Sequence, residues 1–414
     1  MMKPWKLLFS VTIVLLAVLI LPGKADATIV SSGDYGENLT WILDDTGTLT
    51  ISGVGPMTNS YWLRIVGIKK IVIEDGVTAI ADSAFDCVSY PQMAIESVVI
   101  GATVETIGAR AFRACKALKE IQLSASVKEI GYDAFGECDA LENIIVDPDN
   151  TIYCSVNGAL LSKDKTELIR VPGGISGLYL IPESVTSFAD GAFSNCKKIE
   201  AVTIPVGVRT VSKNAFYNCS SLTSVLLPES VTTIAHSAFS FCTSLPDITL
   251  PQTVSSIENC AFESCKSLRS IVIPEGVTVI KGATFYQCNS LVSVTIPKSV
   301  REIENYAFGY CSRLLDVYFG GTQSQWQNVE IASENIYLQG AAIHFAPMRG
   351  DLDGNEKLST DDAVYLLLAV MFGPEDYPVP SGVNLDFDAN AAVDTDDAVY
   401  LLLHIMFGEE DYPI

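Results

Sequence analysis

Most of the chain repeats one pattern of hydrophobic and polar positions. The repeat reads P-x-x-V-x-x-I-x-x-x-A-F-x-x-C-x-x-L-x-x-V-x-I, and its copies recur every 23 residues. Six copies share this frame, and they begin at Pro182, Pro205, Pro228, Pro251, Pro274 and Pro297. Two more begin at Gly101 and Ser124, a stretched copy spans 74–100, and a degenerate unit of 35 residues spans 147–181. A fixed period in this range predicts a solenoid.

Each unit carries the pattern of a short strand. The run L-x-x-V-x-I alternates apolar and polar positions, which predicts a strand with one buried face. The proline after most of these runs ends the strand, and the phenylalanine of each A-F pair fills the inside of the coil. Because no unit can bury its apolar face alone, we expect adjacent units to stack on one continuous core.

Cysteine occupies the same position of the repeat in eight units. These eight, among eleven cysteines in the chain, are Cys115, Cys138, Cys196, Cys219, Cys242, Cys265, Cys288 and Cys311. Equivalent positions in stacked repeats point the same way, so we expect a ladder of small buried thiols and no disulfides between them. A metal site is a poor alternative, because the chain has no C-x-x-C pair and only three histidines. Cys87, Cys154 and Cys260 lie off this ladder.

The repeat frame resembles the BspA-type leucine-rich repeats of bacterial surface proteins. The resemblance covers about residues 71–345 and rests on nine copies in register. It implies a right-handed leucine-rich repeat β-solenoid of 23-residue units. The segment 36–57 looks like the β-rich cap of such arrays, which we assign to 28–70, and 320–345 looks like the segment that closes them. Caps are needed because an open end would expose the core.

The resemblance also implies adhesion or protein binding by the array. One outward column of strand positions is mostly small and weakly charged, and it reads Gln122, Ile145, Thr203, Leu226, Thr249, Val272, Thr295 and Tyr318. Sugar-binding faces usually offer aromatic platforms, and here only Tyr318, with Trp326 nearby, would serve. We therefore expect an unknown protein or surface ligand and not a glycan, with a spacer that binds nothing as the alternative.

The N-terminus has the pattern of an export signal, which we assign to 1–27. Lys3 and Lys6 precede an apolar run over 7–21, and Ala25-Asp26-Ala27 fits a cleavage site. An uncleaved membrane anchor is the alternative, but the run is shorter than the roughly 20 residues of a spanning helix. We expect a secreted protein, extracellular or associated with the cell surface, with no membrane insertion after cleavage. The formal net charge of −23 argues against nucleic acid and anionic membranes as partners.

The C-terminal segment 350–414 contains one acidic loop and one apolar helix, each present twice. The stretch "DLDGNEKLSTDDAVYLLLAVMFG" at 351–373 recurs nearly unchanged 35 residues later. The oxygen-bearing residues of each loop have the spacing that wraps a Ca²⁺ ion, with an acidic surface turn as the alternative. We expect two Ca²⁺ ions, held by side chains or carbonyl groups of Asp351, Asp353, Asn355, Lys357, Ser359, Asp362, Asp386, Asp388, Asn390, Ala392, Asp394 and Asp397.

This tail resembles type I dockerins over its full length, after a linker at 346–349. Aspartate at loop position 12 and the lack of a helix before either loop carry the resemblance. It implies a small all-α domain of paired loop–helix units that docks on a cohesin domain of a cellulosome-type scaffold, in polysaccharide catabolism. Both helices carry apolar residues on every face, and two packed helices can bury only one stripe each. Some of these apolar residues should therefore stay exposed unless a partner covers them. The expected partner-binding residues are Thr360, Asp361, Tyr365, Leu367, Leu368, Thr395, Asp396, Tyr400, Leu402 and Leu403.

Two further expectations concern the duplication. Near identity of the two halves predicts two equivalent docking orientations. Loop position 6, usually glycine because the chain bends there with positive φ, is Glu356 in the first loop and Ala391 in the second. This departure predicts reduced Ca²⁺ affinity, especially in the second loop.

No catalytic motif is present in the sequence. His236, His344 and His404 have no carboxylate or nucleophile partner nearby in the chain, and G-x-S-x-G, H-E-x-x-H and phosphate-binding glycine loops are all missing. We expect a protein that is not an enzyme. Two alternatives stay open: a free surface adhesin whose tail self-associates, and an enzyme or inhibitor that uses the repeat face.

Overall fold

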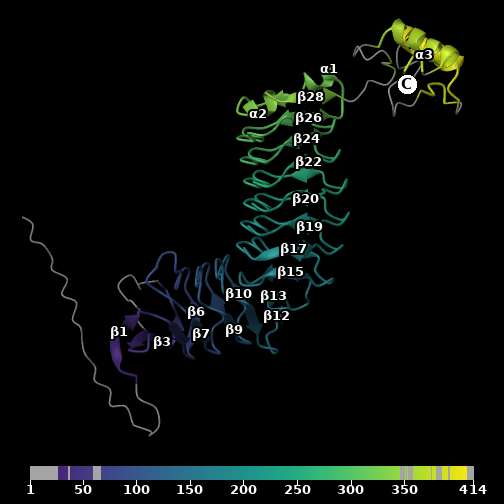
Figure 1. Ribbon diagram of the computed structural model, residues 1–414. Helices are drawn as coiled ribbons and strands as arrows, with labels where there is room; N and C mark the ends of the chain where they lie inside the picture. The colour runs from purple at the N-terminus through teal and green to yellow at the C-terminus, as the bar shows by residue number, and fades with distance from the viewer. Residues whose placement is uncertain are drawn as a thin grey trace, which may run out of the picture.

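The fold is a long coil of repeats followed by a separate pair of helices (Figure 1). The computed structural model describes residues 27–35, 38–58, 67–345, 350, 352, 358–373, 375–378, 385–389 and 392–407. The predicted signal peptide, apart from Ala27, and the predicted linker 346–349 lie outside these residues. Within them, no helix is long and apolar enough to cross a membrane.

Three antiparallel strands begin the array, in the segment where the sequence predicts a β-rich cap. They are β1 (Ile29–Tyr35), β2 (Leu39–Asp44) and β3 (Thr48–Gly53). The last of them pairs in parallel with β5 (Lys70–Ile73), the first strand of the array. Its apolar residues join the same core as the first repeats, so the cap covers the open end of the solenoid.

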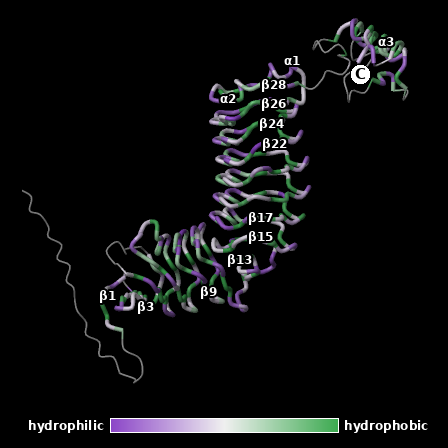
Figure 2. Tube along the Cα trace, viewed as in Figure 1, coloured by the Kyte–Doolittle hydropathy of each residue, from purple (hydrophilic) through white to green (hydrophobic). Residues whose placement is uncertain are grey.

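Most repeats contribute one parallel strand to the same face of the coil, as the L-x-x-V-x-I pattern predicts, and this face is called the main sheet here. It is made of several shorter sheets, and the unit 228–250 forms no strand in its L-x-x-V-x-I segment. These strands are β5, β7 (Ser97–Ile100), β9 (Glu120–Leu123), β11 (Asn143–Val146), β15 (Gly177–Leu180), β17 (Ile199–Thr203), β19 (Ser224–Leu226), β22 (Ser270–Val272), β24 (Ser293–Ile296), β26 (Asp316–Phe319) and β28 (Ala342–Phe345). Figure 2 shows hydrophobic and hydrophilic stretches alternating along the coils. Solenoid folding is thus confirmed.

A second parallel sheet, which the sequence pattern did not reveal, forms from the V-x-x-I segment of each repeat. Its short strands are β4 (Gly55–Pro56), β6 (Val77–Ile80), β8 (Thr106–Ile107), β10 (Glu129–Ile130), β16 (Ser187–Phe188), β18 (Thr210–Val211), β20 (Thr233–Ile234), β21 (Ser256–Ile257), β23 (Val279–Ile280), β25 (Glu302–Ile303) and β27 (Glu330–Ile331). Most of these strands have only two residues, too few for alternation to be visible in the sequence.

Stacked phenylalanine rings and buried thiols run along the inside of the coil. The rings of Phe216 and Phe239 have centroids 5.2 Å apart and planes that differ by 2°. The ladder of free thiols is confirmed: the Cys242 Sγ, for example, donates to the Phe216 carbonyl at 3.1 Å. Each ladder thiol therefore donates a hydrogen bond to a backbone carbonyl of the preceding repeat. A hydrocarbon side chain of the same size could not make this bond.

The degenerate unit 147–181 changes the direction of the array. It holds three antiparallel strands, β12 (Tyr153–Val156), β13 (Ala159–Ser162) and β14 (Glu167–Arg170), and only the last continues into the second sheet, through β16. The core is divided in two at this unit. Figure 1 shows the two parts of the array meeting at an angle there.

The segment 320–345 completes the C-terminal end of the array. It contains α1 (Gln323–Trp326) and α2 (Ile336–Gln339), and it adds β27 and β28 as the last strands of the two sheets. Fully buried Asn335 immediately precedes α2, and its Oδ1 accepts the N–H of Phe308 at 2.9 Å. In earlier repeats this N–H donates to a backbone carbonyl of the next unit, so the asparagine replaces the unit that would follow.

Two helices of 13 residues each make up most of the described tail. They are α3 (Thr360–Phe372) and α4 (Thr395–Phe407), and they share a small hydrophobic core of their own. Ala363 and Leu366 of the first helix and Ala398 and Leu401 of the second are buried in it. The paired loop–helix arrangement follows the duplication in the sequence.

Candidate functional site

The aspartate at position 12 of each acidic loop folds back onto its own loop. In the first copy, Asp362 Oδ1 accepts the Leu352 N–H at 2.8 Å, and Oδ2 accepts the Ser359 N–H at 2.7 Å. In the second copy, Asp397 repeats this pattern with Phe387 at 2.6 Å and Asp394 at 2.8 Å.

Both carboxylates are fully buried, and both lie in the first turn of a helix. Negative charge is favourable at that helix end. The two aspartates therefore fix where each helix starts.

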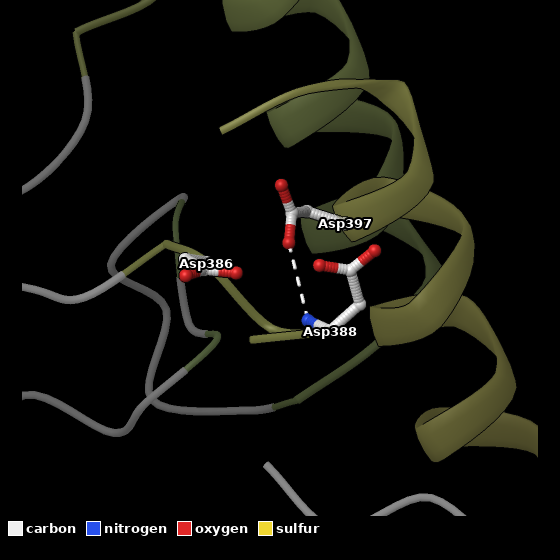
Figure 3. A group of neighbouring side chains, drawn as sticks. All are labelled: Asp386, Asp388 and Asp397. Carbon is white, nitrogen blue, oxygen red and sulfur yellow. Dashed lines mark hydrogen bonds between the residues drawn. The ribbon is translucent and has the colours of Figure 1, made fainter. Parts of the chain in front are cut away.

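Three carboxylates of the second loop converge on one point. Oxygens of Asp386, Asp388 and Asp397 all lie within 4.8 Å of one another, and Figure 3 shows the three side chains around a common space. Asp388 also donates its N–H to Asp397 Oδ1 at 3.2 Å. Hard oxygen ligands at this spacing fit a Ca²⁺ ion, which takes about 6–8 of them.

Apart from Asp362, described above, the remaining predicted ligands divide into two groups. Ser359 caps α3, and Ala392 and Asp394 lie in the second loop before α4. The other predicted ligands lie outside the described residues, and they are Asp351, Asp353, Asn355, Lys357 and Asn390. The residues described thus bring together three of the twelve predicted ligands as a carboxylate cluster.

The left-handed turn of the second loop lies at position 4. Ala389 has φ of 60°, a conformation that costs a non-glycine residue roughly 1–2 kcal/mol. The equivalent residue of the first loop is Gly354, which lies outside the described residues, as do Glu356 and Ala391 at position 6. The second loop therefore bends at an alanine, whose side chain disfavours the positive φ that the bend requires.

The apolar residues predicted to bind a partner are partly exposed. Tyr365, Leu367, Tyr400 and Leu402 are half-buried against the tail core, and Leu368 and Leu403 are half-buried as well. The four predicted polar positions at the helix starts are exposed, and they are Thr360, Asp361, Thr395 and Asp396.

The strongly exposed apolar residues form two matching sets, one from each helix. They are Val364, Met371 and Phe372 and, 35 residues on, Val399, Met406 and Phe407. The sequence did not single them out because both helices are apolar on every side.

The main sheet of the array presents a second candidate surface. Seven of the eight predicted outward positions are exposed and Thr295 is half-buried, so the predicted orientation of the column is confirmed. Leu180 and Val99 extend the same column through the degenerate and stretched units. Leu180 and Leu226 are each 62% exposed. Large apolar side chains thus recur along one face of the sheet.

Two expectations about aromatic residues need correction. Trp326 is half-buried, with its ring 5.0 Å from that of Phe319, so it offers no open platform. Exposed Tyr306 and Tyr310 instead flank Tyr286 on the turn side of the coil, with edge-on ring contacts at 6.0 and 5.4 Å. They lie in turns and not in the strand columns, which is why the strand pattern did not reveal them.

His344 has a carboxylate partner that sequence distance concealed. Strands β26 and β28 are adjacent, and the His344 Nε2 lies 2.8 Å from Asp316 Oδ1. The imidazole also stacks on the ring of Tyr318, with centroids 4.8 Å apart. All three side chains lie on the surface of the main sheet.

The chain is similar to known repeat proteins across most of its length. The family model for the BspA type leucine rich repeat region matches residues 57–153, 88–175, 179–254 and 236–336. No curated protein matches the chain.

The chain is similar to solved structures, of which that of PcpA supports the fold. The pneumococcal vaccine antigen PcpA is 17% identical with a TM-score of 0.54, and the match covers 78% of this chain and 100% of that one. A leucine rich cell surface protein from Faecalibacterium prausnitzii is 22% identical with a TM-score of 0.44, over 73% and 98% of the two chains. Because the family model spans more than half of the sequence, the chain belongs to the BspA-type leucine-rich repeat family.

Proposed function

We propose that this protein is a secreted, non-catalytic binding protein that is docked on a scaffold by its tail. The array contacts another protein through its main sheet, and the tail binds two Ca²⁺ ions and then a cohesin domain. Membership of the BspA-type family supports protein binding by the array. The calcium and cohesin steps rest on the tail alone.

The observation that carries the docking step is the repeated apolar face of the tail. Phe372 and Phe407 are 59% and 57% exposed at equivalent positions of the two helices. Contiguous exposed apolar side chains favour a protein interface, and aromatic residues are enriched at the centres of such interfaces. Since each helix carries the same set, either copy can offer the same face to a partner.

Calcium has a structural role in this proposal. The converging carboxylates of Asp386, Asp388 and Asp397 repel one another at short range, and a bound divalent cation neutralises them. Asp397 also accepts backbone N–H groups from the loop, so cation binding and the position of the α4 start are coupled. Removal of Ca²⁺ is therefore expected to loosen the helix pair that carries the docking face.

The outward column of the main sheet supports the array's role. Exposed aliphatic residues such as Leu226 and Val272 alternate there with Thr203 and Thr249. This mixture gives a broad, mildly apolar surface with little charge, which fits a protein partner better than a sugar. The sheet is held rigidly by the stacked core, so the surface is already formed before binding.

The docking step is tested by pull-down with the full chain from the extracellular fraction of the producing cells. Recovery of a cohesin-bearing scaffold, identified by mass spectrometry, is expected with Ca²⁺ and not with a chelator. Equal recovery in chelator would contradict the calcium step. A chain that dimerises in purified form, through its tail, would support the self-associating adhesin instead.

Single and double substitutions separate one docking face from two. Phe372→Ser and Phe407→Ser are each expected to retain scaffold binding, because the other copy remains, and the double variant is expected to lose it. Tyr310→Ser is the matched control, because Tyr310 is an aromatic residue 54% exposed on the array. Loss of binding in either single variant would show that only one orientation is used.

The array's role is tested in the same experiment. Leu226→Lys places a charge in the outward column and is expected to reduce recovery of the array's partner while scaffold recovery stays unchanged. Val206→Lys is its control, because Val206 is 72% exposed in a turn outside the column. An unchanged set of recovered proteins for Leu226→Lys would argue for the spacer alternative.

A further inference from the structure

Two cysteines on neighbouring repeats lie within reach of each other. The Sγ atoms of Cys87 and Cys115 are 3.7 Å apart. Both thiols also face the same acceptor, the Phe85 carbonyl, at 3.7 and 3.6 Å. Elsewhere in the described array most ladder thiols donate to the carbonyl of a phenylalanine, and Cys196 donates to the Val171 carbonyl.

The stretched repeat explains why this pair exists. In regular units the cysteine follows A-F-x-x, but in the unit 74–100 it follows A-F-x, and the insertion comes directly after it. Cys87 therefore begins the ladder one residue early and shares the acceptor that Cys115 would otherwise use alone. The pair is a consequence of the insertion and not of the repeat frame.

Backbone contacts hold the two residues in adjacent coils. The Cys87 N–H donates to the Arg113 carbonyl at 2.8 Å, and the rings of Phe85 and Phe112 stack 5.5 Å apart. Neither residue lies in a strand, but adjacent coils are stacked through parallel strands about 4.8 Å apart, and this spacing falls inside the Cα separation of about 4.4–6.8 Å found in disulfides. Closing the gap between the sulfurs requires a movement of about 1.7 Å, which side-chain rotation can supply.

The two thiols differ in exposure and in pKa, as the attacking and resolving cysteines of a disulfide exchange do. Cys87 is half-buried beside exposed Val88, whereas Cys115 is fully buried. The hydrogen bond from Cys115 lowers the pKa of Cys87 below the usual thiol value. Hydrogen bonds to Cys138 and Cys87, together with burial, raise the pKa of Cys115. The more exposed sulfur is thus the better thiolate, and it is the one that a soluble oxidant can reach.

We propose that Cys87 and Cys115 are a redox-sensitive pair that closes to a disulfide in contact with a small-molecule disulfide such as oxidised glutathione. The Cys87 thiolate attacks one sulfur of the oxidant, forms a mixed disulfide and releases one glutathione thiolate. Cys115 then loses its proton and attacks the Cys87 Sγ, which releases the second glutathione. The protein pair loses two protons and two electrons, and the oxidant is reduced to two thiols.

The bond would fasten the stretched unit to the first regular one. It joins residues 28 positions apart, across the backbone contacts between the two units. Such a link restricts the unfolded chain and keeps the N-terminal repeats in register when the array opens from that end. Its formation does not depend on the docking function of the tail.

The test is peptide mapping of the full chain after exposure to oxidised glutathione under native conditions. We expect the chain mass to fall by about 2 Da as two hydrogens are lost. The thiol count after denaturation should fall from eleven to nine. Digestion with trypsin should yield peptide 71–110 joined to peptide 114–116, and the midpoint of denaturant unfolding should rise.

Variants make the result specific. Cys87→Ser is expected to abolish the joined peptide and the rise in midpoint. Cys154→Ser, which removes another half-buried thiol, is expected to leave both unchanged. A count of eleven thiols after oxidation would overturn the proposal, and so would joined peptides that contain Cys154 or Cys260 in place of Cys87.

Discussion

Asn335 closes the hydrogen-bond ladder at the end of the array, and its removal offers a sharp test of how the solenoid is capped. In the preceding repeat, the Phe285 N–H donates to the Ala307 carbonyl at 2.8 Å. No repeat follows Phe308, so its N–H donates to Asn335 Oδ1 at 2.9 Å. The Asn335 Nδ2 donates to the carbonyls of Glu304 and Ala332 at 2.9 and 3.0 Å.

The change Asn335→Ala removes all three of these hydrogen bonds inside a fully buried site. A buried N–H left without an acceptor costs about 1–3 kcal/mol, and each lost hydrogen bond to a carbonyl adds about 0.5–1.5 kcal/mol. We therefore expect the free energy of unfolding of the last repeats to fall by about 3 kcal/mol. Earlier repeats should be affected less, because each contacts only its neighbours.

Hydrogen exchange of the full chain measures this effect locally. The Phe308 amide should exchange about 100-fold faster in Asn335→Ala, whereas the Phe216 amide should change little. The control is Asn328→Ala, which removes an exposed asparagine of the same segment that donates to the Ser324 carbonyl. That change should cost less than about 0.5 kcal/mol. Equal protection of Phe308 in both variants would refute the capping role.

Three further predictions concern the tail and the thiols. Ala389→Gly should stabilise the second loop by about 0.5–1 kcal/mol, since glycine adopts positive φ without a steric penalty, and the change would appear as slower hydrogen exchange at the start of α4. Asp397→Asn should destabilise the same helix start by about 2 kcal/mol, with or without Ca²⁺, because it weakens the hydrogen bonds that this carboxylate accepts from loop N–H groups. Burial raises the pKa of Cys265 from 9.0 to about 12, and the array should lose stability as pH rises from about 9 towards that value.

The loss of stability at high pH follows from the different pKa values of Cys265 in the folded and unfolded chain. Below pH 9 both states keep the thiol proton, and above it only the unfolded chain releases the proton, which favours unfolding. Cys265→Ala should therefore show a smaller loss of stability between pH 8 and pH 11 than the parent chain. Equal losses in the two proteins would show that other groups dominate the alkaline loss of stability.

The control for Asp397→Asn is Asp396→Asn, which changes an exposed neighbour. For Ala389→Gly, faster hydrogen exchange at the start of α4 would contradict the backbone strain at residue 389.

Much of the architecture was predictable because repetition makes it visible. The 23-residue period, the strand of each unit and the thiol ladder all follow from equivalent residues in equivalent places. The duplication of the acidic loops is equally visible in the sequence, and in the structure oxygens of Asp386, Asp388 and Asp397 lie close together. Such patterns can be recognised in the sequence because each copy of the repeat or loop shows them again.

Other features appeared only in three dimensions. The apolar helices gave no preferred face in the sequence, and their packing on a shared core around Leu366 and Leu401 leaves Phe372 and Phe407 exposed. The closeness of Cys87 and Cys115 depends on an insertion that shifts one residue against the frame.

By itself, the sequence determined the repeat and its core, and it predicts the calcium chemistry of the tail. The tertiary structure decided which surfaces stay open, where the array bends and which side chains meet. The physical reason is that burial patterns are local and periodic, whereas contacts between units depend on how far each unit departs from the period.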